Sequence, residues 1–417
     1  MRLTLVSETY APQVNGVSRT LGELVRCLRA AGDVVQLIHP DYGRPPESPH
    51  DQLVATRPLP FYREVSLALP PFGAVHRAID AFGPDLIHIA TEATLGLSVL
   101  RHATRRRLPV VSSFHTNFDQ YGAHYRVGWI GGLIWRYLRW FHNRTSETYV
   151  PSRSTIADLE ARGFRRLVLW PRGVDAQLFR PDRPERDEIR RALGFAPDAP
   201  VIVHVGRLAP EKNVEFLGQA LDLVARAMPL ARILIVGDGP SRPALEATLA
   251  DRARFVGYRT GDDLADHFAS GDLFAMTSKT ETFGNVVLEA MSCGLPVVGI
   301  AAGGVGETIK EGRTGLLIPP AAPPSALADR LTELLDDAVE RRRMADAARQ
   351  YALSQSWHAI MGDLRSSYLR VIAGQGQSSG ALPVRIPHID PEPPRSHGRP
   401  APVGTSAIAD SPPRDRP

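Results

Sequence analysis

The sequence predicts an α/β protein built from two Rossmann-like domains. Short apolar runs of strand length alternate with helical patterns, which is typical of βαβ units around a parallel sheet. This alternation occurs twice, beginning at residues 3–6 and again at 200–205. The chain of 417 residues is long enough for two α/β domains of ordinary size. The repeated pattern and the length together indicate two consecutive α/β halves.

Each half contributes its own set of expected elements. In the first half we expect strands at 3–6, 34–39, 85–89 and 109–113, and a helix at 18–30. In the second half we expect strands at 200–205, 232–236, 255–257, 273–276 and 296–299, and helices at 214–227 and 286–293. An amphipathic helix after Trp357 is expected to end near residue 372, and a Pro-, Gly-, Ser- and Arg-rich segment without apolar periodicity follows it. Such a composition predicts disorder.

These elements predict the following division of the chain. The parts are an N-terminal domain 1–178, a linker 179–198, a C-terminal domain 199–352, a C-terminal helix 353–373 and a disordered tail 374–417.

Composition excludes several classes of protein. The net charge of +4 is small for this length, and nucleic-acid binding needs a clustered basic face. Cys27 and Cys293 are too distant in sequence to form a motif, which favours a reducing compartment and no zinc site. The chain shows no signal-peptide pattern and no long uncharged apolar stretch. We therefore expect a cytoplasmic protein without a metal, with attachment to a membrane surface left open.

Two glutamates follow the fourth expected strand of the second half. Glu281 lies in the loop after that strand, and Glu289 lies within the next helix. Ligands bind at the carboxyl ends of strands in doubly wound sheets, and a helix start near Gly284 offers N–H groups to a phosphate. Carboxylates accept strong hydrogen bonds from sugar and ribose hydroxyls. Both glutamates could instead be solvated, although the apolar neighbours of Glu289 disfavour that interpretation.

Basic and glycine-rich loops follow the first two strands of the second half. Arg207 and Lys212 follow Gly206 after the first strand, and their spacing suits a diphosphate, with Arg as a bidentate fork and Lys as a point charge. A solvated basic loop is the alternative. Gly237 follows the next strand, where a glycine permits close approach of a nucleotide but equally an ordinary turn.

Two positions in the first half complete the candidate site. Gly16 lies in the loop after the first strand, and could pass close to a phosphate or simply form a β–α turn. This loop lacks the G-x-G-x-x-G spacing of dinucleotide-binding enzymes. His115 follows the strand at 109–113, from which it could reach a ligand between the domains, or it could be a structural histidine.

Together these motifs resemble the family 4 glycosyltransferases, which have the two-domain GT-B fold with an interdomain cleft. The matching segments are 12–17, 114–116, 206–213, 236–240 and 281–298, and they occur in the family's order over residues 1 to about 370. The segments 114–116, 170–175 and 281–291 are similar to those of bacterial α-mannosyltransferases that use GDP-mannose. Sulfoquinovosyl- and glucosyltransferases that build glycolipids are near relatives.

The resemblance implies a role for each site residue. Arg207 and Lys212 would neutralise the departing diphosphate, Glu281 would hold donor sugar hydroxyls, and Glu289 would hold the ribose. His115 would hydrogen-bond the sugar near the reacting carbon. The backbone at several positions would approach the phosphate, nucleotide and sugar: Gly16, Gly206, Gly237, Phe283, Gly284, Asn285 and Val286.

The resemblance also implies a reaction. It implies a retaining hexosyltransferase in which the leaving phosphate takes the acceptor proton, without a carboxylate nucleophile. The sequence contains no Asp-x-Asp, so fixed cations rather than a metal would hold the diphosphate. The nucleotide-sugar, most simply GDP-mannose, is then a substrate, and no cofactor is expected. The C-terminal helix would cross back to the first domain and couple closure of the cleft.

An aromatic and basic segment at 125–144 bears on the acceptor. It contains Trp129, Trp135 and Trp140 together with Arg126, Arg136 and Arg139. This composition fits an interfacial helix that meets anionic lipid or a lipid-linked glycan acceptor. Packing inside the first domain, with its arginines extending to solvent, explains the same pattern.

Four other functions are weighed against mannosyl transfer to a lipid. They are a UDP-sugar-dependent glycolipid synthase, a sugar-nucleotide epimerase, a non-catalytic nucleotide-sugar-binding protein and a nicotinamide oxidoreductase. The presence of Arg207, Lys212 and both glutamates favours transfer, and the missing glycine fingerprint disfavours the oxidoreductase.

Overall fold

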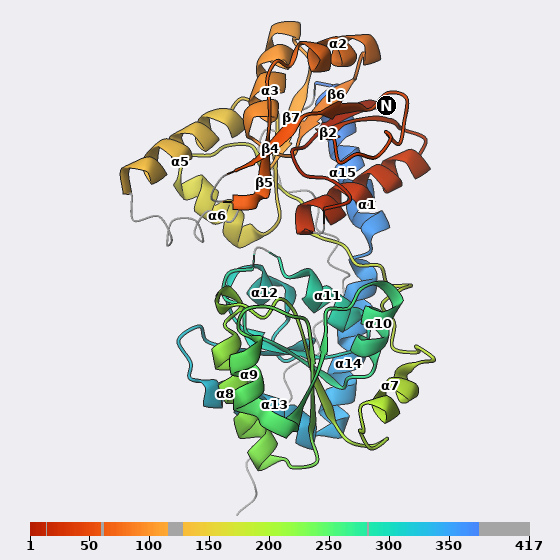
Figure 1. Ribbon diagram of the computed structural model, residues 1–417, viewed down its shortest axis with the longest axis vertical. Coiled ribbons are helices and arrows are strands. Elements are labelled where there is room, and N and C mark those ends of the chain that lie inside the picture. Colours follow the sequence, from red (N-terminus) through yellow and green to blue (C-terminus); the bar gives the residue numbers. More distant parts are fainter. Residues whose placement is uncertain (14, 60–61, 116–127, 282, 375–417) are drawn as a thin grey trace, which may run out of the picture. The chain divides into compact units, whose positions relative to one another are not determined.

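Two parallel sheets form the framework of the molecule (Figure 1). The computed structural model describes residues 1–13, 15–59, 62–115, 128–281 and 283–374. Apart from Gly374 itself, the tail predicted to be disordered lies outside the described residues. The two sheets confirm the prediction of two consecutive Rossmann-like halves.

The first half contains a sheet of seven strands in the order β3-β2-β1-β6-β7-β8-β9, and every neighbouring pair is parallel. Its strands are β1 Arg2–Val6, β2 Val34–Pro40, β3 Gln52–Val54, β6 Leu86–Ile89, β7 Val110–Ser113, β8 Thr148–Val150 and β9 Leu167–Leu169. A separate antiparallel pair consists of β4 Thr56–Leu59 and β5 Tyr62–Ala68. The helices are α1 Gly16–Ala30, α2 Gly73–Phe82, α3 Thr94–Arg106, α5 Gly128–His142 and α6 Arg153–Ala161.

The second half contains a parallel sheet of six strands in the order β12-β11-β10-β13-β14-β15. Its strands are β10 Val201–Val205, β11 Arg232–Val236, β12 Ala253–Gly257, β13 Leu273–Met276, β14 Val297–Ile300 and β15 Gly315–Ile318. Its α-helices are α7 Arg186–Ala192, α8 Val214–Ala227, α9 Arg242–Leu249, α10 Gly261–Ala269, α11 Asn285–Ser292, α12 Gly303–Thr308, α13 Pro324–Asp336 and α14 Ala338–Ser354. Two 3₁₀ turns are η1 Pro210–Lys212 and η2 Ala250–Arg252.

The strand order of each sheet locates where a ligand can bind. In both sheets the first strand of the half is internal, and the chain extends to one side of it before crossing to the other. The direction therefore reverses between β1 and β6, and again between β10 and β13. Loops at the carboxyl ends of the strands diverge at such a point and leave a crevice for ligands.

Burial explains why these segments are strands. β10 has the sequence Val-Ile-Val-His-Val and all five residues are buried, as expected for a parallel strand covered on both faces. Ile202 packs in a core with helices α8 and α13, and Val201 and Val203 pack in a second core with α11. Every strand predicted from the sequence is present within one or two residues, whereas β3, β4, β5, β8, β9 and β15 were not predicted.

The last helix, α15 Trp357–Ile372, packs against the first half. Trp357, Leu364 and Tyr368 are buried in the same core as helix α1. Arg365 donates two hydrogen bonds to Asp33, at 2.6 and 3.0 Å. Coupling of this helix to closure of a cleft stays a prediction.

The segment predicted as a linker, 179–198, contains helix α7. Arg183 forms an ion pair with Asp266 of α10, and Arg190 donates to the carbonyl of Ala199. These contacts tie the segment to the second half.

Candidate active site

Two glycine-containing loops at the carboxyl ends of β10 and β11 interlock through their backbones. Gly206 N–H donates to Val236 O at 3.0 Å, and Leu208 N–H donates to Asp238 O at 2.9 Å. A Cβ at position 237 would lie 1.9 Å from Gly206 O, and one at position 239 would lie 2.4 Å from Leu208 O. Both glycines have positive φ, 136° and 156°. Glycine is therefore required at positions 237 and 239 to bring these two loops into contact.

The loop after β10 holds the two predicted cations. Arg207 is exposed over 60% of its side chain and lies 3.8 Å from Glu211. Lys212 ends the 3₁₀ turn η1, and its carbonyl accepts a hydrogen bond from Thr277 Oγ1 at 3.1 Å, directly after β13. This contact fixes the Lys212 backbone next to the loop that carries Glu281.

Lys212 and Glu281 form an ion pair between Nζ and Oε1. Their side chains are 28% and 20% exposed, so both groups remain accessible to a ligand. Since β10 and β13 flank the reversal point of the sheet, this pair lies where a doubly wound fold binds its ligand. The structure thus brings together two residues that were predicted from separate motifs.

The loop that carries Glu281 leads into helix α11. Glu281 O accepts a hydrogen bond from Gly304 N–H at 3.0 Å, and a Cβ at position 303 would lie 2.5 Å from the same oxygen. Gly284 precedes the helix with φ of 79°, and Asn285 begins it. Because Gly284 has no side chain to cap the helix, the first N–H groups of α11 can donate to an anion.

The other predicted positions of this loop lie beside that helix start. Phe283 and Val286 are partly buried against the core that includes α11.

Glu289 lies on α11 and is 3% exposed, so the surface alternative for this residue is wrong. Its Oε1 lies 2.5 Å from Nη1 of Arg19 on α1. Sequence reasoning did not single out Arg19, although it stands three residues after Gly16. A Cβ at Gly16 would have no atom within 4 Å, so the start of α1 is open at that position.

His115 follows β7, and both of its ring nitrogens have protein partners. Nδ1 lies 3.1 Å from Arg172 Nη2, and Nε2 lies 2.8 Å from Ser113 Oγ. Burial and the Arg172 charge hold the pKa of His115 well below its usual range. Arg172 donates from Nη1 to Trp170 O at 2.9 Å, and burial lowers its pKa to about 10. Arg172 lies in the motif 170–175, but sequence reasoning assigned it no role.

Most of the predicted residues gather at the carboxyl ends of the strands, in two groups. The second half holds Gly206, Arg207, Lys212, Gly237, Glu281 and residues 283–289. The first half holds Gly16 and His115. Among the described residues, His115 forms its hydrogen bonds with Arg172 and Ser113, and neither Lys212 nor Glu281 bonds to it. The segment 116–127, which includes Thr116 of the predicted motif, lies outside the described residues.

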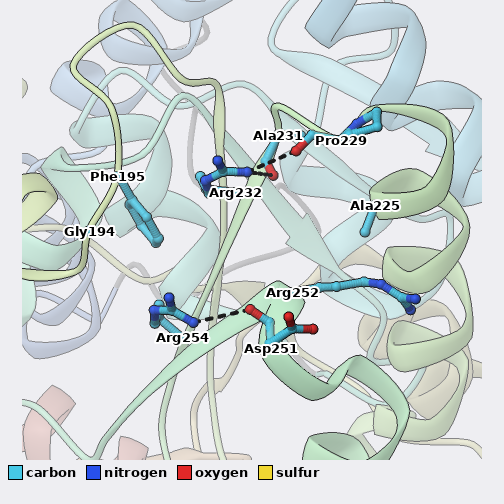
Figure 2. Close-up of a pocket in the computed structure, with 9 residues that line it drawn as sticks. All are labelled: Gly194, Phe195, Ala225, Pro229, Ala231, Arg232, Asp251, Arg252 and Arg254. Atoms are coloured by element: carbon cyan, nitrogen blue, oxygen red, sulfur yellow. Dashed lines mark hydrogen bonds between the residues drawn. The ribbon is translucent and has the colours of Figure 1, made fainter.

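A small cavity in the second half lies away from this group (Figure 2). It is lined by Gly194, Phe195, Ala225, Pro229, Ala231, Arg232, Asp251, Arg252 and Arg254. Arg232 begins β11 and Arg254 lies in β12, so the cavity is at the amino ends of the strands. Arg232 donates to the carbonyls of Pro229 and Ala231, and Arg254 to the carbonyl of Asp251. These guanidinium groups donate to the chain's own backbone, and none of the predicted site residues lines the cavity.

The predicted interfacial segment forms helix α5 over its described part. Trp135 packs against Phe164, and Leu138 and Phe141 are buried, as the packing alternative requires. Leu133 is 54% exposed, and Ile134 and Trp140 also reach solvent, as do Arg136 and Arg139. Arg126 and the side chain of Trp129 lie outside the described part. Among the helices that are described, none has both the length and the apolar character needed to span a bilayer.

The two halves of the chain match two family descriptions. Glycosyltransferase Family 4 matches residues 14–178, and Glycosyl transferases group 1 matches residues 185–351. Together with relatives that are more than 30% identical over nearly their whole length, these matches show that the chain belongs to the group 1 and family 4 glycosyltransferases, with the GT-B fold.

Individual relatives give the closer context. A GDP-mannose-dependent alpha-mannosyltransferase of Mycobacterium tuberculosis is 36% identical, covering 88% of this chain and 96% of the relative. Sulfoquinovosyl transferase SQD2 of Arabidopsis thaliana is 35% identical, covering 85% of this chain and 70% of the relative. The crystal structure of Anabaena Alr3699/HepE in complex with UDP has a TM-score of 0.71 at 21% identity, covering 88% of this chain and 99% of that one. This last likeness concerns the fold alone.

Proposed function

We propose that this glycosyltransferase moves a hexosyl group, mannose from GDP-mannose, to a lipid or lipid-linked glycan acceptor with retention of configuration. The observation that carries the proposal is the pairing of Lys212 with Glu281 at the reversal point of the second sheet. A donor sugar diphosphate needs both partners, because its phosphates require a cation and its hydroxyls require an acceptor. The pair offers both groups in one place.

The chemistry follows from where charge develops. As the bond from the sugar to the diphosphate breaks, negative charge grows on the leaving phosphate, and Lys212 and Arg207 would stabilise it. The N–H groups at the start of α11 would add a partial positive charge on the same side. In the retaining reaction that we propose, the leaving phosphate accepts the acceptor's proton, and fixed cations replace a metal.

GDP-mannose is favoured as donor by the relatives that are similar to this chain. Several of them, at 30 to 36% identity over most of its length, are GDP-mannose-dependent alpha-mannosyltransferases. The similarity to SQD2 is almost as high, which supports a second candidate: transfer from a UDP-sugar to a glycolipid acceptor.

The acceptor proposal rests on helix α5. Its exposed Leu133, Ile134 and Trp140 lie on the same helix as the exposed Arg136 and Arg139, a combination suited to an anionic lipid surface. The paired change Leu133→Ser and Ile134→Ser should reduce flotation with anionic vesicles. Leu230→Ser is the matched control, because Leu230 is 75% exposed in the second half. Absence of wild-type flotation would remove the membrane from the proposal.

Nucleotide release tests the reaction. Purified protein is offered GDP-mannose, UDP-glucose, UDP-galactose or UDP-sulfoquinovose with mixed lipid acceptor, with and without EDTA. Release from GDP-mannose, loss of that release in Glu281→Ala, and an α-linked product by NMR would support the proposal. Glu246→Ala, a glutamate that pairs with Arg242 on α9, is the control. Release from a UDP-sugar alone would favour the second candidate, and binding without release from any donor would favour a non-catalytic protein.

A further inference from the structure

A chain of hydrogen bonds runs from Arg172 through His115 into the core of the first half. Arg172 Nη2 lies 3.1 Å from His115 Nδ1, and His115 Nε2 lies 2.8 Å from Ser113 Oγ. Ser113 Oγ lies 2.9 Å from His88 Nε2, and His88 Nδ1 lies 2.7 Å from the hydroxyl of Tyr368 on α15. Ser113, His88 and Tyr368 are at most 1% exposed, so bulk solvent does not compete for these bonds.

The first bond of this chain fixes the protonation of His115. A guanidinium has N–H donors and no acceptor, so the nitrogen facing it must carry a lone pair. Nδ1 of His115 is therefore unprotonated, and the single ring proton lies on Nε2. A doubly protonated ring would turn an N–H towards the guanidinium, which both charge and geometry oppose.

The second bond fixes the direction in which that proton points. Because Nε2–H is the donor, Ser113 Oγ accepts it at 2.8 Å. Ser113 is held in turn by strand β7 and by His88. The charged and titratable groups that act on His115 are Arg172, His88 and His142, and the last two are buried with their pKa values lowered to about 3.

Arg172 is itself held in place. Its Nη1 donates to Trp170 O at 2.9 Å, its guanidinium carbon lies 5.0 Å from the centre of the Trp170 ring, and the residue is 7% exposed. The guanidinium therefore has little freedom to leave Nδ1.

We propose that Arg172 is a positioning residue that holds His115 as the neutral Nε2–H tautomer, and that Ser113, supported by His88 and Tyr368, holds that N–H until a sugar oxygen replaces the serine. The last step rests on the proposed function, whereas the tautomer does not. His115 then serves as a hydrogen-bond donor to the sugar and not as a base, because its only lone pair is bound to Arg172.

The tautomer can be measured without donor or acceptor. In protein labelled with ¹⁵N-histidine, the signals that disappear in His115→Gln belong to His115. They are expected to show the neutral Nε2–H pattern from about pH 8 to about pH 5.5, without titration. In Arg172→Met the pattern should change to a mixture of tautomers. A wild-type Nδ1–H tautomer, an imidazolium at neutral pH, or an unchanged spectrum in Arg172→Met would overturn the proposal.

Two further variants distinguish a change of tautomer from a loss of folding. Arg190→Met also removes a buried arginine that donates to backbone carbonyls, but in the second half, and should leave the His115 signals unchanged. Ser113→Ala keeps Arg172 in place, so it should retain the Nε2–H tautomer while that proton exchanges faster with solvent. Slow exchange in Ser113→Ala would overturn the role of the serine.

Activity then separates positioning from binding. Arg172→Met should lower kcat by about 10- to 100-fold, the cost of misplacing a catalytic group, with the donor Kd little changed. Tyr368→Phe should lower kcat by a smaller factor than Arg172→Met does. Tyr149→Phe is the control and should leave kcat unchanged, since both tyrosines are buried in the same core with ring centres 5.7 Å apart. If the tautomer result holds but wild-type protein transfers no sugar, the proposed function fails and the assignment of Arg172 stands. Equal losses in both tyrosine variants would overturn the role of Tyr368.

Discussion

Lys212 Nζ forms an ion pair with Glu281 Oε1 between the loops that follow β10 and β13. Each side chain satisfies the charge of the other. In our proposal the donor separates them, because its diphosphate takes the lysine and its sugar hydroxyls take the glutamate. The two residues therefore contribute to different parts of donor recognition.

This division predicts different phenotypes for the two residues. Lys212→Met removes a charge-assisted hydrogen bond of about 1.5–3 kcal/mol, so the affinity for GDP should fall by about 10- to 100-fold. Glu281→Gln should leave GDP affinity unchanged or higher, because Lys212 is released, while kcat falls. Calorimetric titration with GDP, which lacks the sugar, and steady-state kinetics measure the two effects. Equal loss of GDP affinity in both variants would show that the ion pair is only structural.

The ion pair between Glu289 and Arg19 leads to a second prediction, in which substitutions of its two partners have different effects on GDP affinity. Glu289→Gln weakens the acceptor that we propose for the ribose hydroxyls, so GDP affinity should fall by about tenfold. Arg19→Gln breaks the 2.5 Å ion pair but leaves the carboxylate, so GDP affinity should stay the same or rise slightly. Comparing the two Kd values tests the ribose role. Weaker binding in Arg19→Gln, to the extent seen in Glu289→Gln, would assign the carboxylate a structural role instead.

The fold class and the central strands of both sheets could be predicted from the sequence, because strands that are buried on both faces are apolar along their whole length. Runs such as 201–205 and 232–236 are apolar along their whole length, as buried parallel strands require. β8 and β9 were not predicted, because each has only three residues, such as Thr148–Val150, and so short a segment shows no periodicity. The short edge strand β3 escaped for the same reason.

The sequence predicted the site only for residues that come directly after neighbouring strands of one sheet. Residues after neighbouring strands, such as Lys212 and Glu281, meet because the carboxyl ends of parallel strands share one edge. Arg19 is 270 residues from its partner Glu289, and Arg172 is 57 residues from His115. No local pattern marks an arginine for a partner so distant, since only the folded packing of helix and loop brings them together.

The contact between the loops after β10 and β11 predicts a steric effect at Gly237. Gly237→Ala would place a Cβ 1.9 Å from Gly206 O at a φ of 136°, so the loops must separate. We expect a loss of at least about 3 kcal/mol in the free energy of unfolding, or a rearranged loop that no longer binds GDP. Gly312→Ala is the control, because φ there is 70° but nothing lies within 4 Å. Urea unfolding measures both, and similar small losses would show that backbone strain alone matters.

Because Glu8 is a buried carboxyl, we expect the stability of the fold to depend on pH in an unusual way. The side chain is 6% exposed beside the start of α3, where Leu95 N–H donates to it at 2.6 Å. Burial raises the pKa of this carboxyl from 4.5 to about 7, against the lowering effect of that hydrogen bond. The folded state therefore binds a proton more tightly than the unfolded state. As the pH falls from 7 to 4.5, Glu8 is protonated in the folded state while it is still ionised in the unfolded state, so the free energy of unfolding increases. Above pH 7 Glu8 is ionised in both states, and its buried charge lowers the free energy of unfolding.

Glu8→Gln removes this charge at every pH. The variant should be more stable than wild type at about pH 8.5, by up to a few kcal/mol, and the difference should fall below about 1 kcal/mol near pH 5. Urea unfolding at both pH values measures it, with Glu160→Gln, exposed on α6, as the control for loss of one surface carboxylate. Because the glutamine carbonyl can still accept the Leu95 N–H, the helix start keeps its partner. If Glu8→Gln is destabilised equally at both pH values, the carboxylate is ionised in the fold and is held there by the start of α3.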